Sequence, residues 1–135
     1  MQIRSVALLV FFIPFFIQAQ SINIIPKPAY IKQKSGKFPL AATTKIVVTD
    51  DTLTGTANLF NDYLKEYYGF TLPVAKRITK NNRNCIVLSL KEANKDTIPG
   101  AYALDIADNH ISITGNDPQG VFYGIQSLIQ LLPFE

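Results

Sequence analysis

Hydrophobic and polar positions alternate most regularly near the end of this chain. Apolar side chains recur at every second position in two short runs: Tyr102, Leu104 and Ile106, then Ile111 and Ile113. A period of two is typical of strands with one buried face, so the pattern predicts two strands. Asp108-Asn109 lies between them and predicts a tight hairpin turn, because both residues tolerate the positive φ that such a turn demands.

A helix is expected directly after the second strand. Asn116 and Asp117 can cap it, and Pro118 suits its first position, where a missing N–H costs nothing. The apolar residues that follow recur at helical spacing: Val121, Ile125, Leu128, Ile129 and Leu132. Gly120 and Gly124 lie four residues apart, so this helix can approach the sheet closely.

The first half of the chain predicts further elements. Residues 45–49 (KIVVT) and 85–90 (CIVLSL) are expected to be strands, the second of them central because it is apolar on both faces. Between them, one helical face is apolar and Gly69 follows it at the usual C-terminal position: Leu53, Ala57, Phe60, Leu64 and Tyr67. Residues 71–74 are expected to be extended, and residues 79–84 a loop.

The N-terminal part of the domain is expected to be extended over residues 22–28, where two prolines remove backbone donors. Ser35-Gly36 predicts a second hairpin turn, flanked by residues 30–33 and 37–40. Two amphipathic helices and one sheet predict an α+β fold. We expect a mixed, mostly antiparallel sheet with both helices packed on one face.

The first residues of the chain indicate an export signal. Arg4 precedes an apolar run of 12 residues, 6–17, and the small residue Ala19 follows. This order is typical of a secretory signal peptide, and the run is shorter than the roughly 20 residues of a membrane span. We therefore expect a signal peptide over residues 1–19, a mature domain over 20–135, a secreted or periplasmic location, and no stable membrane span after cleavage. The alternative is an uncleaved signal anchor.

Charge and cysteine content exclude several classes. The net charge of +3 becomes +2 when Arg4 is removed with the signal, and Lys and Arg are not clustered. This argues against a nucleic-acid-binding surface. Cys85 is the only cysteine, so no internal disulfide can form, and its apolar neighbours predict a buried, inert thiol.

The residues that could carry chemistry have simpler interpretations. His110 is the only histidine, which excludes a multi-histidine metal site, and its alternating position predicts a solvated imidazole. Carboxylates next to helix starts and turns are expected to act as caps or turn residues: Asp50, Asp51, Asp108 and Asp117. Three tyrosines could stack on a sugar ring, although their helical positions predict partial burial: Tyr67, Tyr68 and Tyr123. We predict no catalytic, cofactor-binding or metal-binding residue in this chain.

Two stretches of the chain resemble the accessory domain that precedes the catalytic barrel of β-N-acetylhexosaminidases, glycoside hydrolase family 20: INIIPKPAYIKQKSGKFPL and GAYALDIADNHISITGNDPQGVFYGIQSLIQLLP. The helix motif GVFYGIQSLIQLL is the most specific part. The resemblance covers residues 22–133.

The resemblance implies an activity whose catalytic residues are not in this sequence. Family 20 enzymes hydrolyse terminal N-acetylhexosamine residues, with a Glu as acid and the adjacent Asp orienting the substrate's acetamido group, outside the usual two-carboxylate scheme. This sequence has no Asp-Glu dipeptide and is too short for a (β/α)8 barrel of about 250 residues. The expectation is an inactive, truncated accessory domain, with the barrel of the same enzyme as partner.

Two other functions stay open. The chain could be a stand-alone secreted module that binds a glycan or a protein, or the accessory domain of another glycosidase family, such as the O-GlcNAcase/hyaluronidase-like or α-glucuronidase groups.

Overall fold

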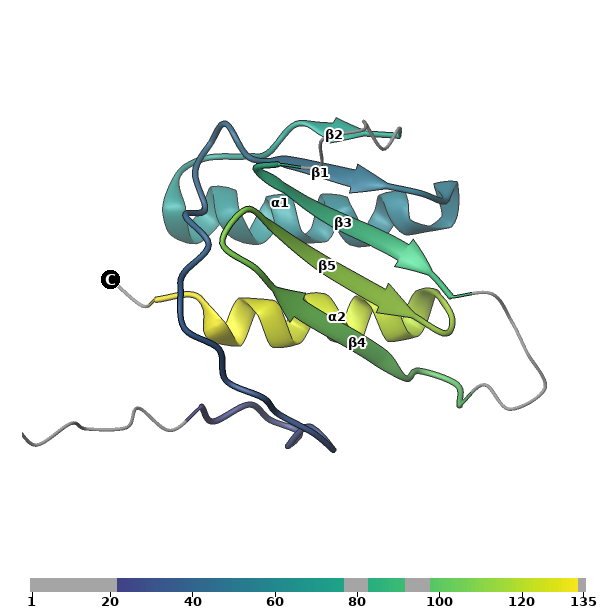
Figure 1. Cartoon of the computed structure of the whole chain (residues 1–135). Helices are drawn as coiled ribbons and strands as arrows, with labels where there is room; N and C mark the ends of the chain where they lie inside the picture. The colour runs from purple at the N-terminus through teal and green to yellow at the C-terminus, as the bar shows by residue number, and fades with distance from the viewer. Residues whose placement is uncertain (1–21, 77–82, 92–97, 134–135) are drawn as a thin grey trace, which may run out of the picture.

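The computed structural model describes residues 22–76, 83–91 and 98–133. Within these ranges, five strands form one sheet and two α-helices lie against it (Figure 1). In chain order, the elements are β1 (Lys45–Val48), the 3-10 turn η1 (Asp51–Leu53), α1 (Thr54–Tyr68), β2 (Val74–Ala75), β3 (Cys85–Leu90), β4 (Tyr102–Ile106), β5 (His110–Gly115) and α2 (Pro118–Leu131). The predicted signal peptide lies outside the described residues, as does most of the predicted loop 79–84.

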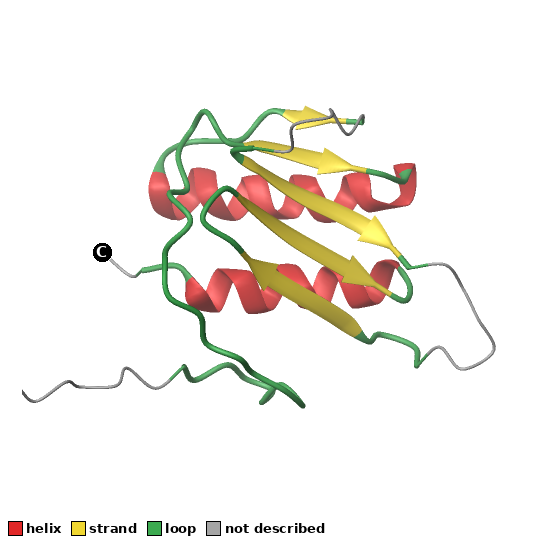
Figure 2. Ribbon diagram, viewed as in Figure 1, coloured by secondary structure: helices red, strands yellow, loops and turns green. Residues whose placement is uncertain are grey.

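Both helices cover the same face of the sheet, as expected (Figure 2). The core lies between these two layers and takes side chains from both helices and from β1, β3 and β5. Its fully buried members include Ile46, Phe60, Leu64, Ile113 and Ile125. On the opposite face, Val47, Cys85 and Val87 form a small separate buried cluster. The α+β fold class is therefore confirmed.

The expectation of a mostly antiparallel sheet is wrong. The strand order is β2-β1-β3-β5-β4, and the β1–β2, β1–β3 and β3–β5 pairs are parallel. Only β4–β5 is antiparallel. The β4–β5 hairpin is easy to recognise in the sequence because its two strands are consecutive. The parallel β1–β2 pair is not, because its strands are separated by α1. The central position predicted for β3 is confirmed, and its residues 85–88 are all buried, as parallel strands usually are.

The predicted turn at Asp108-Asn109 is present, but its backbone differs from the expected one. Ala107 N–H donates to the His110 carbonyl at 2.9 Å, which closes the hairpin around these two residues. Neither has a positive φ, since Asn84 is the only described non-glycine residue that does. The helix boundaries follow the sequence signals closely. Gly69 ends α1 with a left-handed φ of 74°.

The second predicted hairpin, around Ser35-Gly36, is wrong. No strand is present in the described residues before β1, and residues 30–37 are exposed. An isolated two-stranded hairpin is marginal in water, so this segment instead follows the end of the sheet beside the β4–β5 turn. There Lys34 pairs with Asp105 at 2.7 Å. Gly36, at φ +107°, lies so close to Asp108 that a Cβ would stand 2.0 Å from its Oδ1.

The two predicted close-approach glycines on α2 are confirmed. A Cβ on Gly120 would lie 2.4 Å from the Ala101 carbonyl oxygen, and one on Gly124 would lie 2.3 Å from Cγ2 of Ile113. These contacts hold α2 tightly on the β4–β5 part of the sheet. The described part of the chain includes no helix long and apolar enough to cross a bilayer.

Candidate docking surface

Two of the three carboxylates next to helix starts act as caps, whereas Asp51 lies in the first turn of η1, after the N-cap Asp50. Asp117 accepts hydrogen bonds from the backbone N–H groups of Gly120 (2.7 Å) and Gly100 (2.9 Å). These bonds favour the ionised form and lower the pKa of Asp117 below its ordinary value. Asp50 accepts from the hydroxyl and the N–H of Thr52, which lowers its pKa in the same way. Both carboxylates are thus engaged in holding a helix start.

The next two acidic candidates lie at exposed positions. Asp51 pairs with Lys76 at 2.8 Å on the surface, and Asp108 occupies the hairpin turn beside Gly36. Exposed pairs of this kind contribute little to stability. The described residues contain no group of three His, Cys, Asp or Glu side chains that could hold a metal ion.

The structure brings Cys85 and His110 together, which sequence spacing did not reveal. The two residues are register partners in the parallel β3–β5 pair, so their side chains lie on the same face of the sheet. Cys85 is only 3% exposed, and burial raises the pKa of its thiol. His110 is half-buried, with Nδ1 2.8 Å from Oδ1 of Asn109. Since the thiolate is the nucleophile, this environment keeps Cys85 unreactive.

The partial burial predicted for the tyrosines is confirmed for Tyr68 and wrong for Tyr67. Tyr67, placed on the buried face by its spacing, is 59% exposed, and the neighbouring Tyr68 is half-buried instead. Tyr68 donates from its hydroxyl to the Pro133 carbonyl at 2.6 Å, which fixes the chain just after α2. Tyr63 stacks on Tyr67 with ring centroids 4.7 Å apart. Together with Phe70, which packs on Tyr68, they form an aromatic cluster at the C-terminal end of α1.

The outward side of α2 has an unusual composition. None of the helix's residues, PQGVFYGIQSLIQL, is charged. Five of the exposed or half-buried side chains lie along one side of this helix and form what we call the α2 outer face: Gln119, Phe122, Tyr123, Gln126 and Gln130. A surface helix normally carries charged residues on its solvent side. Interface cores, by contrast, are depleted in charge and enriched in aromatic residues. The α2 outer face is therefore the candidate docking surface.

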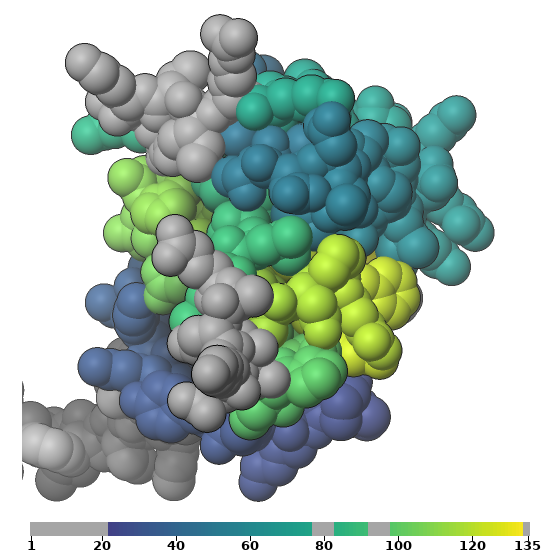
Figure 3. Space-filling view, turned by 90° about the vertical axis from the view of Figure 1, so that its right-hand side faces the viewer, coloured from purple at the N-terminus to yellow at the C-terminus, as the bar shows by residue number. Residues whose placement is uncertain are grey.

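In Figure 3, α2 lies between α1 and the N-terminal segment. The outward side of α1 is different, since it exposes Asp62, Lys65 and Glu66. On the N-terminal side, Ile25 contacts α2 through the side chain of Gln130. Sequence reasoning missed Gln126 and Gln130, although the lack of charge over residues 118–131 was a readable signal.

Comparison with known proteins agrees with this fold. The profile of glycosyl hydrolase family 20, domain 2, matches residues 21–135. The chain is 31% identical over 116 residues to a β-hexosaminidase of Porphyromonas gingivalis (strain ATCC BAA-308 / W83). This alignment covers 86% of the present chain and 15% of the β-hexosaminidase.

Solved structures show the same arrangement. The family 20 β-N-acetylhexosaminidase of Streptomyces coelicolor A3(2) matches 82% of this chain and 21% of its own, with a TM-score of 0.68 and 29% identity. The chitobiase of Flavobacterium johnsoniae matches 84% of this chain and 18% of its own, with a TM-score of 0.67 and 21% identity, which shows the fold alone.

The matches first define a class: this is an α+β domain that occurs as a small part of much longer hydrolases. The chain belongs to domain 2 of glycosyl hydrolase family 20. The resemblance seen in the sequence is thus confirmed. The chain spans about a fifth or less of the length of these relatives, and its 135 residues hold no catalytic barrel.

Proposed function

We propose that this chain is the non-catalytic domain of a secreted β-N-acetylhexosaminidase and that it docks against the enzyme's catalytic barrel through the α2 outer face. The observation that carries the proposal is the uncharged, partly aromatic outward side of α2, in a chain that matches only 15% of a β-hexosaminidase. In the full-length enzyme, the barrel would hydrolyse terminal N-acetylhexosamine residues, and this domain would stabilise it.

The absence of catalysis is tested by an activity assay. Purified residues 20–135 are incubated with a chromogenic N-acetyl-β-glucosaminide. We expect no turnover above the blank, because the sequence contains no Asp-Glu dipeptide, the pair that carries catalysis in family 20 enzymes. Turnover that co-purifies with the chain would contradict the non-catalytic role.

Docking is tested in a chimera. Residues 20–135 replace the 116 aligned residues of the Porphyromonas gingivalis β-hexosaminidase. If the domain docks, calorimetry shows it unfolding together with the barrel, at a higher temperature than the isolated chain, because bound partners stabilise each other. Two independent transitions, one matching the isolated chain, would count against docking.

Secretion is tested by the mass of the mature protein. The whole reading frame, expressed in a bacterial host, should yield an exported product that begins at Gln20, because residues 1–19 have the order of a signal peptide. An exported or membrane-bound product that keeps Met1 would instead indicate the uncleaved anchor.

Calorimetric titration with chitin oligosaccharides distinguishes a glycan-binding role from docking. Docking alone predicts no saturable heat of binding. Saturable binding that is lost on Tyr67→Ala or Tyr123→Ala, the two tyrosines that are exposed in the described residues of the helices, would favour a glycan-binding module.

A further inference from the structure

The N-terminal arm, residues 22–31, is fixed to α2 by one side chain. The Ile25 N–H donates to Oε1 of Gln130 at 2.8 Å, and Nε2 of Gln130 donates to the Ile25 carbonyl at 2.9 Å. One amide thus pairs with both backbone groups of one residue, as a neighbouring strand would. The two residues are 105 positions apart in sequence.

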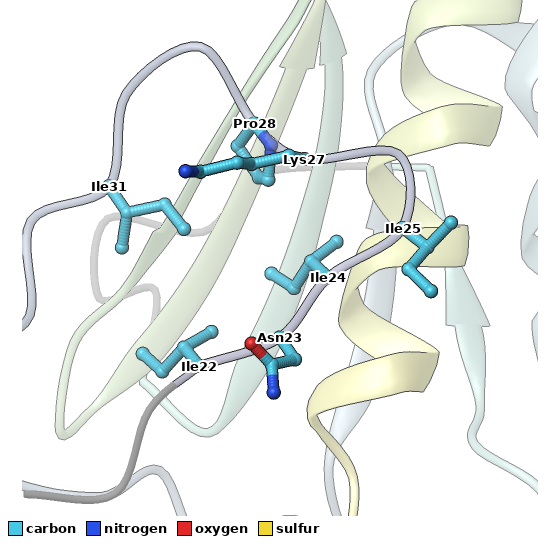
Figure 4. A pocket seen from close by; sticks show the side chains of 7 residues that line it. All are labelled: Ile22, Asn23, Ile24, Ile25, Lys27, Pro28 and Ile31. Carbon is cyan, nitrogen blue, oxygen red and sulfur yellow. The ribbon is translucent and has the colours of Figure 1, made fainter.

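This pairing sets the direction of the Ile25 side chain. Ile24 beside it is 9% exposed and anchors the arm, whereas Ile25 is 81% exposed. The arm encloses a pocket whose lining includes Ile22, Ile24, Ile25 and Ile31, and in Figure 4 the Ile25 side chain lies on the side of the arm nearer α2. A single exposed isoleucine is ordinary on a protein surface. An exposed isoleucine whose backbone is held on an uncharged helix is better explained as part of that surface.

Accordingly, we propose that Ile25 is an anchor residue of the docking surface, held by Gln130 so that the arm and the α2 outer face contact the catalytic barrel as one continuous surface. The proposal rests on the proposed function and extends it from the helix to the arm. The barrel is the occupant because the family relatives carry most of their length outside this domain. Gln126 and Gln130 lie one helical turn apart, and the Gln130 amide also donates to the Gln126 carbonyl at 3.3 Å. The arm therefore joins the α2 outer face at the C-terminal end of the helix.

The test compares Ile25→Ser with Ile98→Ser, in the isolated chain and in the chimera. Ile98 is the matched control, because it is 70% exposed and lies on the connection before β4. In the isolated chain, both substitutions should leave the unfolding midpoint within about 3 °C, since surface changes have small effects. In the chimera, Ile25→Ser should lower the midpoint of the joint transition by about 3 °C or more beyond any effect of Ile98→Ser.

Gln130→Met provides a second variant that tests the clamp itself. Methionine has a similar length but cannot pair with the backbone of Ile25, so the arm is released while the helix keeps a good helix former. We expect this variant to follow Ile25→Ser in the chimera and to resemble the unsubstituted protein in isolation.

The outcomes separate the two proposals. If the unsubstituted chimera unfolds in two independent transitions, docking itself fails and this inference fails with it. If it unfolds jointly but Ile25→Ser and Gln130→Met behave like Ile98→Ser, docking stands and the role of the arm is overturned.

Discussion

The two helices of this domain have nearly the same length and cover the same face of one sheet, yet their outward sides differ. α1 has 15 residues and exposes three charged side chains, Asp62, Lys65 and Glu66, together with the apolar Leu59 and Tyr67. α2 has 14 residues and exposes glutamine and tyrosine without a single charge. The inward sides therefore report the fold, whereas the difference between the outward sides supports the proposal that α2 is the helix that docks against the barrel.

The largest effects should show that the inward sides are equivalent. Phe60 on α1 and Ile125 on α2 are both fully buried in the same core. Phe60→Ala should lower the free energy of unfolding by about 3–5 kcal/mol and Ile125→Ala by about 2–5 kcal/mol, through lost burial and the cavity left behind. Urea unfolding measures both. A cost below about 1 kcal/mol for either would mean that this helix is not packed as described.

Replacing one glycine on each helix by alanine should change the free energy of unfolding in opposite directions. Gly120→Ala on α2 forces a methyl group against the backbone carbonyl of Ala101, which cannot move aside easily, and should cost about 1–3 kcal/mol of stability. Gly55→Ala on α1 meets no atom within 4 Å and should stabilise by about 0.5 kcal/mol, because alanine restricts the unfolded chain. Chemical denaturation of the two variants gives the signs. Equal signs would contradict the tight seating of α2.

The acid sensitivity of the helix starts provides a third comparison. The lowered pKa of Asp117 means that its contribution to stability is present above its ordinary pKa of 3.8 and is lost as the pH falls through the lower native value. Asp117→Asn should therefore reduce the loss of stability between pH 5 and pH 2. Thermal unfolding at several pH values measures this loss. Asp50→Asn should remove a separate contribution at η1, since the two carboxylates share no partner. A variant that carries both substitutions tests the two caps together. If it loses as much stability between pH 5 and pH 2 as the unsubstituted protein, these caps do not cause the acid sensitivity.

The smallest effects belong to the outward sides in the isolated chain. Gln126→Glu on α2 and Asn58→Glu on α1 each add one negative charge to an exposed or half-buried helical position. Both should change the free energy of unfolding by less than about 0.5 kcal/mol, because neither residue belongs to the core. A large loss for Gln126→Glu in the isolated chain would mean that the side chain supports the domain itself.

Local signals in the sequence predicted the local structure well. The Asp117-Pro118 cap and the left-handed Gly69 depend on residues within one or two turns of each other. The close approach of Gly120 was predicted from the spacing of two glycines, although its contact is to Ala101 on another segment. Pairing across long distances was not predictable in this way. The parallel strand order, the position of residues 30–40 and the Gln130–Ile25 pair depend on how separate elements meet.

One local error concerns a side chain at the end of a helix. Tyr67 matched the buried face by its spacing, but it lies in the last turn of α1, where Tyr68 turns inward instead. The prediction that this chain contains no catalytic residue still awaits the activity assay.

The most direct test of the central claim places a charge on each outward side in the chimera with the Porphyromonas gingivalis β-hexosaminidase. Scanning calorimetry should show that Gln126→Glu separates the joint unfolding of domain and barrel into two transitions, because a buried unpaired charge at an interface is costly. Asn58→Glu should leave the joint transition unchanged. If Gln126→Glu also leaves it unchanged, or if Asn58→Glu is the variant that separates it, the α2 outer face is not the docking surface.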